Sequence, residues 1–99
     1  MAQVIYSRRA LDDFERLADF LREKAPHAAL EAVDLIRDGI EILARHPLIG
    51  RACERDLREL IISYGKSGYI ALYSYEPLED AVLILVIRHQ REAGYADFT

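Results

Sequence analysis

The sequence is poor in the residues that build disulfides and metal centres. Cys53 is its single cysteine, so no internal disulfide can form, and no cysteine and histidine residues have the spacing of zinc ligands. No apolar run approaches the length of a membrane span, and residues 1–9 lack the apolar core of a signal peptide. We therefore expect a cytoplasmic protein with no membrane partner, no metal and no cofactor.

Common catalytic motifs are missing as well. The sequence has no Gly-rich phosphate-binding loop, and no Ser/His/Asp arrangement of a nucleophilic enzyme can be placed on it. Its formal net charge is −4, so the chain as a whole should repel nucleic acids. We expect no direct sequence-specific nucleic-acid binding, because any such contact would need a local basic patch.

What is present is the composition of one folded domain. The chain has 99 residues, enough for one modest core, and 52% of them are hydrophobic while 30% are charged. It contains no internal repeats, linkers or low-complexity segments. A single domain over residues 1–99 is therefore predicted.

The clearest structural signal is the apolar run at residues 82–87, which predicts a strand buried on both faces. Regular alternation predicts one face with Val82, Ile84, Val86 and Arg88, and another with Leu83, Leu85, Ile87 and His89. Arg88, His89 and Arg91 end this strand, and Tyr95 follows. We expect function to concentrate there; the alternative is that solvated charges simply end the sheet.

The first half of the chain predicts a short strand and two helices. Residues 3–6 form a strand candidate that stops at Ser7, a good helix N-cap residue. Apolar residues recur at helical spacing over residues 8–24, and again over residues 26–45, where a proline opens the helix. The connection is so short that the two helices should form an antiparallel hairpin.

Three strands are predicted to follow, at residues 57–63, at residues 69–75 and from residue 82 onward. Short links make them an antiparallel meander, and the expected fold is α+β with the order β-α-α-β-β-β. The helical hairpin can cover one face of this sheet only. Tyr69 and Tyr73 share a face, so we expect either an aromatic face that a partner covers or tyrosines at the sheet margin with hydroxyls in water.

His89 is the histidine best placed for chemistry, because it lies between Arg88 and Arg91 at the strand end. The neighbouring cations should favour the neutral imidazole, which can act as a base. Arginine, histidine and tyrosine side chains can cleave RNA through the 2′-hydroxyl without a metal, with arginine stabilising the charged phosphorane. The residue pattern leaves this chemistry open and does not establish it.

Four segments of the chain stand in a characteristic order: HPLIGR at residues 46–51, LREL at residues 57–60, GYIALY at residues 68–73 and ILVIRHQRE at residues 84–92. As an ordered set they resemble the RelE/ParE superfamily of toxins from bacterial type II toxin–antitoxin modules. The resemblance covers nearly the whole chain. It implies a small toxin that a cognate antitoxin holds inactive by wrapping its tail around the surface.

The resemblance implies two alternative activities. RelE-type members are ribosome-dependent messenger-RNA endonucleases, whereas ParE-type members poison DNA gyrase and are not nucleases. RelE-type members place basic catalytic groups on the strand that corresponds to residues 60–65, which has none here; only Lys66 follows it. His89, Arg91 and Tyr95 are similar to the terminal residues of the nuclease pattern and are the catalytic candidates for a metal-independent endoribonuclease.

The ParE-type activity is the preferred prediction, because the long hairpin and the ending at residues 88–91 look more ParE-like and the acidic balance suits ribosomal RNA poorly. The chain would then be a gyrase inhibitor without catalytic residues. Its partner-binding candidates are Arg58, Tyr69, Tyr73, Arg88, His89 and Arg91. For Arg58, a salt bridge with Glu59 or Glu92 is the alternative. A degenerate member that binds antitoxin without being toxic is a third interpretation.

Overall fold

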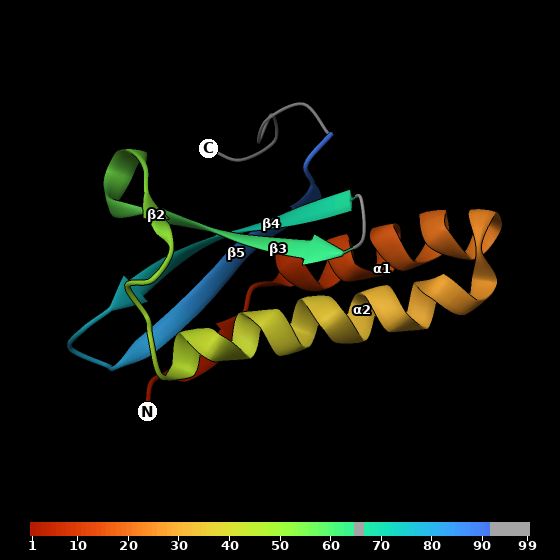
Figure 1. Ribbon diagram of the computed structural model, residues 1–99. Helices are drawn as coiled ribbons and strands as arrows, with labels where there is room; N and C mark the ends of the chain where they lie inside the picture. The colour runs from red at the N-terminus through yellow and green to blue at the C-terminus, as the bar shows by residue number, and fades with distance from the viewer. Residues whose placement is uncertain (65–66, 92–99) are drawn as a thin grey trace.

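In the computed structural model, two antiparallel helices pack against one face of a five-stranded sheet (Figure 1). The structure describes residues 1–64 and 67–91, without the side chains of Lys24, Tyr64 and Ser67. The helices are α1 (Arg8–Lys24) and α2 (Pro26–Glu41), and the strands are β1 (Gln3–Tyr6), β2 (Arg51–Ala52), β3 (Arg58–Tyr64), β4 (Ser67–Glu76) and β5 (Ala81–His89). Two short 3₁₀ turns, η1 (Ile42–Ala44) and η2 (Glu54–Asp56), complete the order. The predicted α+β fold is confirmed.

The strands are ordered β1-β5-β4-β3-β2 across the sheet. The β3–β4 and β4–β5 pairs are antiparallel, as the predicted meander requires, and β1 pairs with β5 in parallel. Sequence patterns did not predict β2, a two-residue strand that pairs with Arg58 and Glu59 at the start of β3. Two residues are too few for a detectable alternation.

The helix boundaries follow from local chemistry. Ser7 caps α1, because its Oγ accepts a hydrogen bond from the Ala10 N–H at 3.0 Å. Pro26 opens α2, which ends at Glu41 rather than at the predicted residue 45, because the chain tightens there into η1. A glycine inside a helix suggests that another element packs closely against it, and Gly39 does allow α2 to lie close to β3. A Cβ at this position would lie 3.2 Å from the Ile62 side chain on β3.

A bulge in β5 changes which of its side chains face the helices. Leu72 pairs with Val86 and Tyr73 pairs with Ile84, so Leu85 has no partner in β4. The extra residue reverses the alternation beyond it. Ile87 and His89 therefore share the face of Val82 and Ile84, and the two faces predicted from regular alternation are wrong for residues 86–89.

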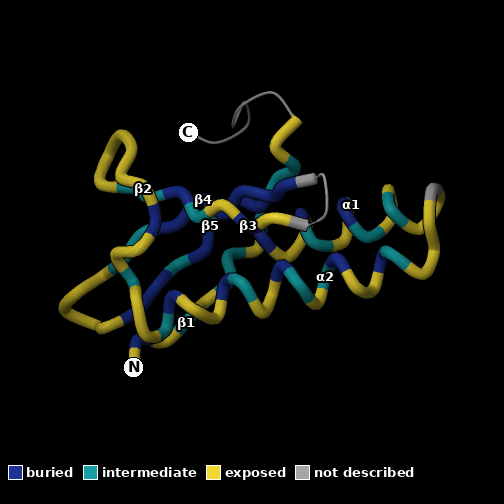
Figure 2. The backbone as a smooth tube through the Cα atoms, in the orientation of Figure 1, coloured by how far each residue is buried: buried dark blue, intermediate teal, exposed yellow. Residues whose placement is uncertain are grey.

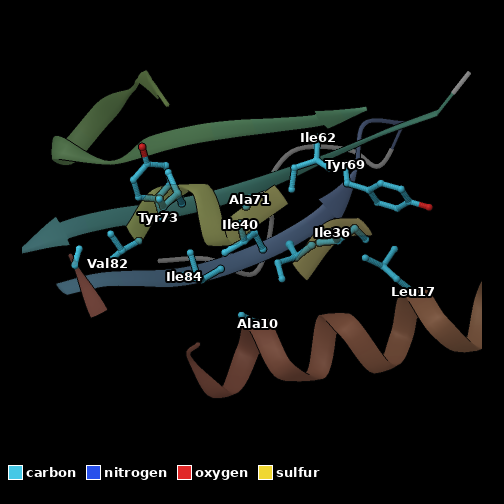
Figure 3. Packing of buried hydrophobic residues seen from close by; sticks show 13 residues of the cluster. Ala10, Leu17, Ile36, Ile40, Ile62, Tyr69, Ala71, Tyr73, Val82 and Ile84 are labelled. Atoms are coloured by element: carbon cyan, nitrogen blue, oxygen red, sulfur yellow. The ribbon is translucent and has the colours of Figure 1, made fainter. Parts of the chain in front are cut away.

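The tyrosines of β4 lie under the helices and not on an uncovered face. Tyr69 is 2% exposed and Tyr73 is 0% exposed, and both belong to the core that α2 closes through Ile36 and Ile40 (Figure 3). The prediction that these tyrosines form a partner-facing surface is wrong. Burying a tyrosine ring removes a large apolar area from water, and this outweighs the requirement to satisfy one hydroxyl.

Burial follows the layers of the fold (Figure 2). The inner sides of the two helices and the middle of the sheet are buried, whereas the outer sides of the helices are exposed. Val82, Ile84 and Ile87 on the helix side of β5, and Val86 on its other side, are at most 2% exposed, whereas Leu83 and Leu85 are only partly buried. The prediction that β5 is buried on both faces is therefore confirmed only in part. No described helix is long and apolar enough to cross a membrane.

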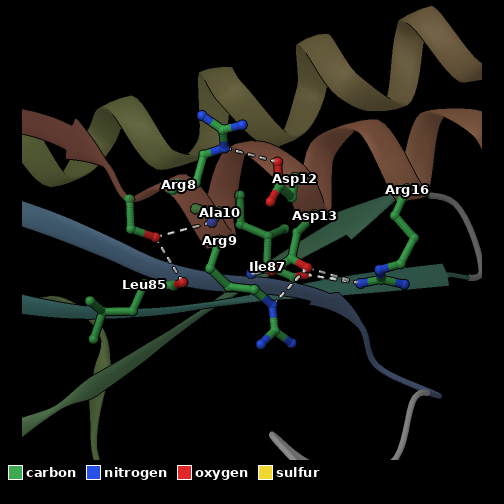
Figure 4. Close-up of polar contacts among 9 residues, drawn as sticks. Arg8, Arg9, Ala10, Asp12, Asp13, Arg16, Leu85 and Ile87 are labelled. Atoms are coloured by element: carbon green, nitrogen blue, oxygen red, sulfur yellow. Dashed lines mark hydrogen bonds and ion pairs between the residues drawn. The ribbon is translucent and has the colours of Figure 1, made fainter. Parts of the chain in front are cut away.

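One edge of β5 is bonded first by β1 and then by side chains of α1 (Figure 4). Parallel pairing with β1 ends at Ile84, where the chain turns into the helix. Beyond that point the Ser7 hydroxyl donates to the Leu85 carbonyl at 3.0 Å, and the Arg16 guanidinium donates to the Ile87 carbonyl at 3.4 Å. The helix thus completes the hydrogen bonds of a buried strand edge.

Asp13 provides the buried part of this connection. Its side chain is 4% exposed, and one carboxylate oxygen accepts the Ile87 N–H at 2.9 Å. The other oxygen lies 3.2 Å from Arg9 Nε and 3.5 Å from a terminal nitrogen of Arg16. Two guanidinium groups and one peptide N–H therefore compensate the desolvated charge.

We predict that Asp13→Ala lowers the free energy of unfolding by about 2–3 kcal/mol, because it leaves the Ile87 N–H buried and unpaired. Urea denaturation followed by circular dichroism measures the change. Asp12→Ala is the matched control, because the Asp12–Arg8 ion pair is exposed and should contribute little. Equal stability of the two variants would contradict the role given to Asp13.

Tyr6 gives the fold a dependence on alkaline pH. Its hydroxyl oxygen is buried without a hydrogen-bond partner in the described part of the chain. Burial and, to a smaller extent, the Glu41 carboxylate raise the pKa of Tyr6 from 10.0 to about 12, although Arg37 opposes the rise. Because the unfolded chain releases this proton first, the stabilisation is complete below pH 10 and is lost as the pH rises toward about 12.

We therefore predict that Tyr6→Phe loses less stability than the wild-type protein between pH 10 and about 12. At neutral pH the variant should be more stable by about 1 kcal/mol, because it no longer buries an unpaired hydroxyl. Denaturation curves across this pH range test both statements. Parallel loss of stability in the two proteins would show that Tyr6 does not carry the effect.

Candidate functional site

The predicted site residues fall into two groups at opposite ends of β4. Tyr69 is opposite His89 on β5, whereas Tyr73 is opposite Arg58 on β3. With a rise of about 3.3 Å per residue, the two tyrosines are roughly 13 Å apart along the strand. The structure therefore does not bring all of the partner-binding candidates into one site.

The first group, Arg58 and Tyr73, holds the turn at residues 47–50. The Tyr73 hydroxyl donates to the Pro47 carbonyl at 2.8 Å and accepts the Gly50 N–H at 2.9 Å. Arg58 donates to the carbonyls of Leu48 and Gly50, at 3.1 and 2.8 Å. Burial raises the pKa of Tyr73, although the Gly50 N–H and the Arg58 charge oppose the rise.

These contacts show that Arg58 and Tyr73 stabilise the turn at residues 47–50. A Cβ at Gly50 would lie 2.6 Å from the Tyr73 hydroxyl oxygen, so the turn and the tyrosine fit only with glycine there. The predicted alternative for Arg58, an ion pair with Glu59, is wrong: Glu59 pairs with Arg51 instead. Glu92, the other proposed partner, lies outside the described residues.

The second group lies at the end of β5. The rings of Tyr69 and His89 meet edge to face, with centroids 5.3 Å apart and an interplanar angle of 88°. The Nδ1 of His89 accepts the Arg91 N–H at 3.1 Å, so the neutral imidazole carries its proton on Nε2. The Arg88 guanidinium donates to the carbonyls of His89 and Gln90, at 3.2 and 3.4 Å.

This geometry limits the chemistry of the strand end. The lone pair of His89 Nδ1 accepts a backbone N–H, so this nitrogen is not free to act as a general base in this geometry. Tyr95, the predicted phenol, lies outside the described residues, as does Lys66. Within the described ranges, no group of three or more histidine, cysteine, aspartate or glutamate side chains could hold a metal ion.

Sequence reasoning missed an apolar groove on the outer side of the helical hairpin. It has a volume of about 720 Å³ and is lined by residues of both helices, among them Phe14, Ala18, Arg22, Leu30 and Val33. Leu30 is 75% exposed, and Phe20 on α1 is 56% exposed. Leu30 lies outside the buried stripe of α2, which was the signal for this groove in the sequence, whereas Phe20 is not among the residues that line it.

Comparisons with known proteins place these features in a family. The family described as "ParE toxin of type II toxin-antitoxin system, parDE" matches residues 4–94. Toxin RelE3 of Caulobacter vibrioides is 41% identical over 92 residues, which cover 93% of this chain and 98% of the relative. Toxin RelE1 of the same organism is 36% identical over 70 residues, covering 71% of this chain and 75% of the relative.

Solved structures share the fold. The chromosomal ParDE system from P. aeruginosa superposes with a TM-score of 0.75 at 22% identity, covering 90% of this chain and 96% of that one. The intact E. coli RelBE toxin–antitoxin complex gives a TM-score of 0.61 at 17% identity, covering 94% of this chain and 100% of the matched chain. At these identities the likeness concerns the fold alone.

We predict that Tyr73→Phe lowers the free energy of unfolding by about 1–2 kcal/mol, because the turn loses one buried and one partly buried hydrogen bond. Chemical denaturation measures the effect. Tyr75→Phe is the control: it also removes a hydroxyl, but one that donates to Asp80 on the surface, so little change is expected. A Tyr73→Phe protein as stable as the control would contradict the structural role of this hydroxyl.

Proposed function

The chain belongs to the ParE toxin family of type II toxin–antitoxin systems, within the RelE/ParE superfamily, and we propose that it inhibits DNA gyrase by direct protein contact until a cognate antitoxin neutralises it. On this proposal the protein is not an enzyme. It has no catalytic residue and needs no cofactor. Arg88, His89 and Arg91 at the end of β5 are contact residues for the target.

The arrangement around His89 is the observation that carries the choice of gyrase over RNA. Its Nδ1 accepts a backbone N–H, its ring packs against Tyr69, and the basic residues beside it in the chain are Arg88, within β5, and Arg91, after the strand. Residues 60–63 of β3 carry no basic side chain. A net charge of −4 also opposes docking into RNA, whereas it does not oppose protein contacts.

An antitoxin partner is supported by the family and by the exposed groove of the helical hairpin. The P. aeruginosa neighbour is a ParDE system, and the E. coli neighbour is a RelBE toxin–antitoxin complex. The groove between α1 and α2 offers a complementary partner helix an apolar surface that includes the exposed Leu30 side chain. Covering this surface removes exposed apolar area from water.

A ribosome-dependent messenger-RNA endonuclease is the second candidate. The observation that favours it is the 41% identity with a relative named Toxin RelE3. His89, Arg91 and Tyr95 would then be catalytic, with no metal. A member that binds its antitoxin without being toxic is a third candidate, and it differs from both by leaving growth unaffected.

Induced expression in bacteria distinguishes these candidates. We predict that the wild-type chain arrests growth with intact transcripts and broken or relaxed DNA, and that His89→Ala retains most of the toxicity because no proton transfer is required. Growth curves, primer extension on abundant messenger RNAs and plasmid topology are measured together. Retained binding of the antitoxin and a native circular dichroism spectrum serve as controls for folding.

The endonuclease alternative makes the opposite forecast for the same strains. Transcripts would be cut at defined positions upon induction, and Arg91→Ala would abolish the cuts. Transcripts that are cut with the wild-type chain and intact with a folded His89→Ala protein would contradict the gyrase proposal. Normal growth upon expression of the wild-type chain would support the third candidate, a member that binds its antitoxin without being toxic.

A further inference from the structure

Helix α1 carries an exposed aromatic side chain that lies outside the helical groove. Phe20 is 56% exposed, and it is not among the residues that line the groove. The groove residues Ala18 and Arg22 each lie two positions from Phe20, a rotation of about 200° around the helix axis. Asp13 and Arg16, which bond the edge of β5, lie seven and four positions before Phe20 and share its side of the helix. Phe20 therefore lies on the flank of α1 that faces β5 and not the groove.

This flank reaches the end of β5. Asp13 accepts an N–H of β5 two residues before the strand ends. One turn further along α1, Leu17 packs near Tyr69 in the core (Figure 3), and the Tyr69 ring meets the ring of His89, the last residue of β5. Phe20 is three residues beyond Leu17, a rise of roughly 4.5 Å along the helix. It therefore lies beside the strand end that is assigned to the target.

The β5-facing flank is basic, in contrast with the chain as a whole. Arg9 and Arg16 approach the Asp13 carboxylate from two directions (Figure 4), and their side chains are 39% and 47% exposed. Arg88 and Arg91 add two further positive charges at the strand end. The Asp13 carboxylate offsets one of these four charges. A local excess of positive charge remains on a chain whose formal net charge is −4.

The combination of arginine and an exposed aromatic ring suits a protein partner better than a nucleic acid. Both residue types are enriched at the centres of protein–protein interfaces. Arg9 and Arg16 already share one carboxylate, so part of their charge is compensated within the chain, and the overall negative charge opposes a polyanion. A protein surface with carboxylates around an apolar pocket satisfies both features, since it pairs with the guanidinium groups and removes the Phe20 ring from water.

We propose that Arg9, Arg16 and Phe20 on the β5-facing flank of α1 form one contact surface with the end of β5, and that this surface binds an acidic segment of gyrase with an apolar pocket for Phe20. The inference rests on the gyrase target of the proposed function and extends the contact surface from the strand onto the helix. The antitoxin groove lies on the other side of α1, so the two partners contact different flanks of one helix.

The first test measures how much toxin inhibits supercoiling by purified gyrase. Phe20→Ala should raise the half-inhibitory concentration at least about tenfold, because the interface loses its apolar anchor. Leu11→Ala is the matched control: it removes a side chain of similar exposure, 50%, from the opposite side of the same helix and should inhibit like the wild type. Phe20→Ala should keep the wild-type antitoxin affinity and circular dichroism spectrum.

The second test measures binding of the chain to gyrase without DNA at several salt concentrations. Arg9→Gln should weaken binding and make it less dependent on salt, because a charged contact is lost. Arg8→Gln makes the same charge change at the neighbouring residue, whose ion pair with Asp12 is exposed on another side of the helix, and should leave both quantities unchanged. A fluorescent DNA duplex without gyrase should not bind the wild-type chain.

The outcomes separate this inference from the proposed function. Undiminished supercoiling with the wild-type chain contradicts the gyrase proposal, and the inference fails with it. Full inhibition by a folded Phe20→Ala protein, beside an active wild type, overturns the helical contact alone. Equal salt dependence of Arg9→Gln and Arg8→Gln overturns the acidic partner segment. Wild-type binding to the duplex as tight as to gyrase would assign the basic flank to DNA phosphates and would also overturn the proposal.

Discussion

The fold depends on how the buried edge of β5 obtains its hydrogen bonds. β5 lies between β4 and β1, but β1 is four residues long and leaves the second half of that edge unpaired. The helix that follows β1 supplies the missing partners: the Ser7 hydroxyl for Leu85, and the Asp13 carboxylate for the Ile87 N–H. Burying Asp13 is tolerable because Arg9 and Arg16 lie beside it. The same contacts fix α1 on the sheet and thereby place α2 and the core.

Periodicity was sufficient to predict the two helices and the four longer strands, and insufficient to predict β2 or which residues share a face of β5. The limits of α1 could be read from Ser7 and Pro26, because capping and proline sterics are local. The bulge at Leu85 could not be predicted from the sequence of β5 alone, because it depends on how β5 pairs with β4. Without it, the sequence misplaces Ile87 and His89, and with them the ring that packs on Tyr69.

The candidate site was predicted by residue type, and the structure reassigns several of its members. Tyr73 and Arg58 looked available for partners, yet their polar groups hold the turn at residues 47–50. Tyr73 contacts residues that lie more than 20 positions earlier in the chain. The spacing of residues in the sequence therefore gave no signal for these hydrogen bonds. Arg88, His89 and Arg91 do lie together at the end of β5, as the charge pattern there indicated.

Two exposed features remain for macromolecular contacts, and they suit protein partners. The groove of the helical hairpin is apolar, and the β5-facing flank of α1 presents Phe20 beside two arginines whose charge Asp13 partly offsets. Neither offers the uncompensated basic surface that an RNA backbone requires. The end of β5, with its arginines, continues this flank and is assigned with it to the target.

The most direct test of gyrase inhibition is a supercoiling assay with the purified chain, bacterial gyrase and relaxed plasmid, with and without the antitoxin. Inhibited supercoiling or trapped cleaved DNA, reversed by the antitoxin, is the result predicted for contact-mediated inhibition of gyrase. Undiminished supercoiling by protein with a native circular dichroism spectrum would contradict it and would direct attention to the ribosome.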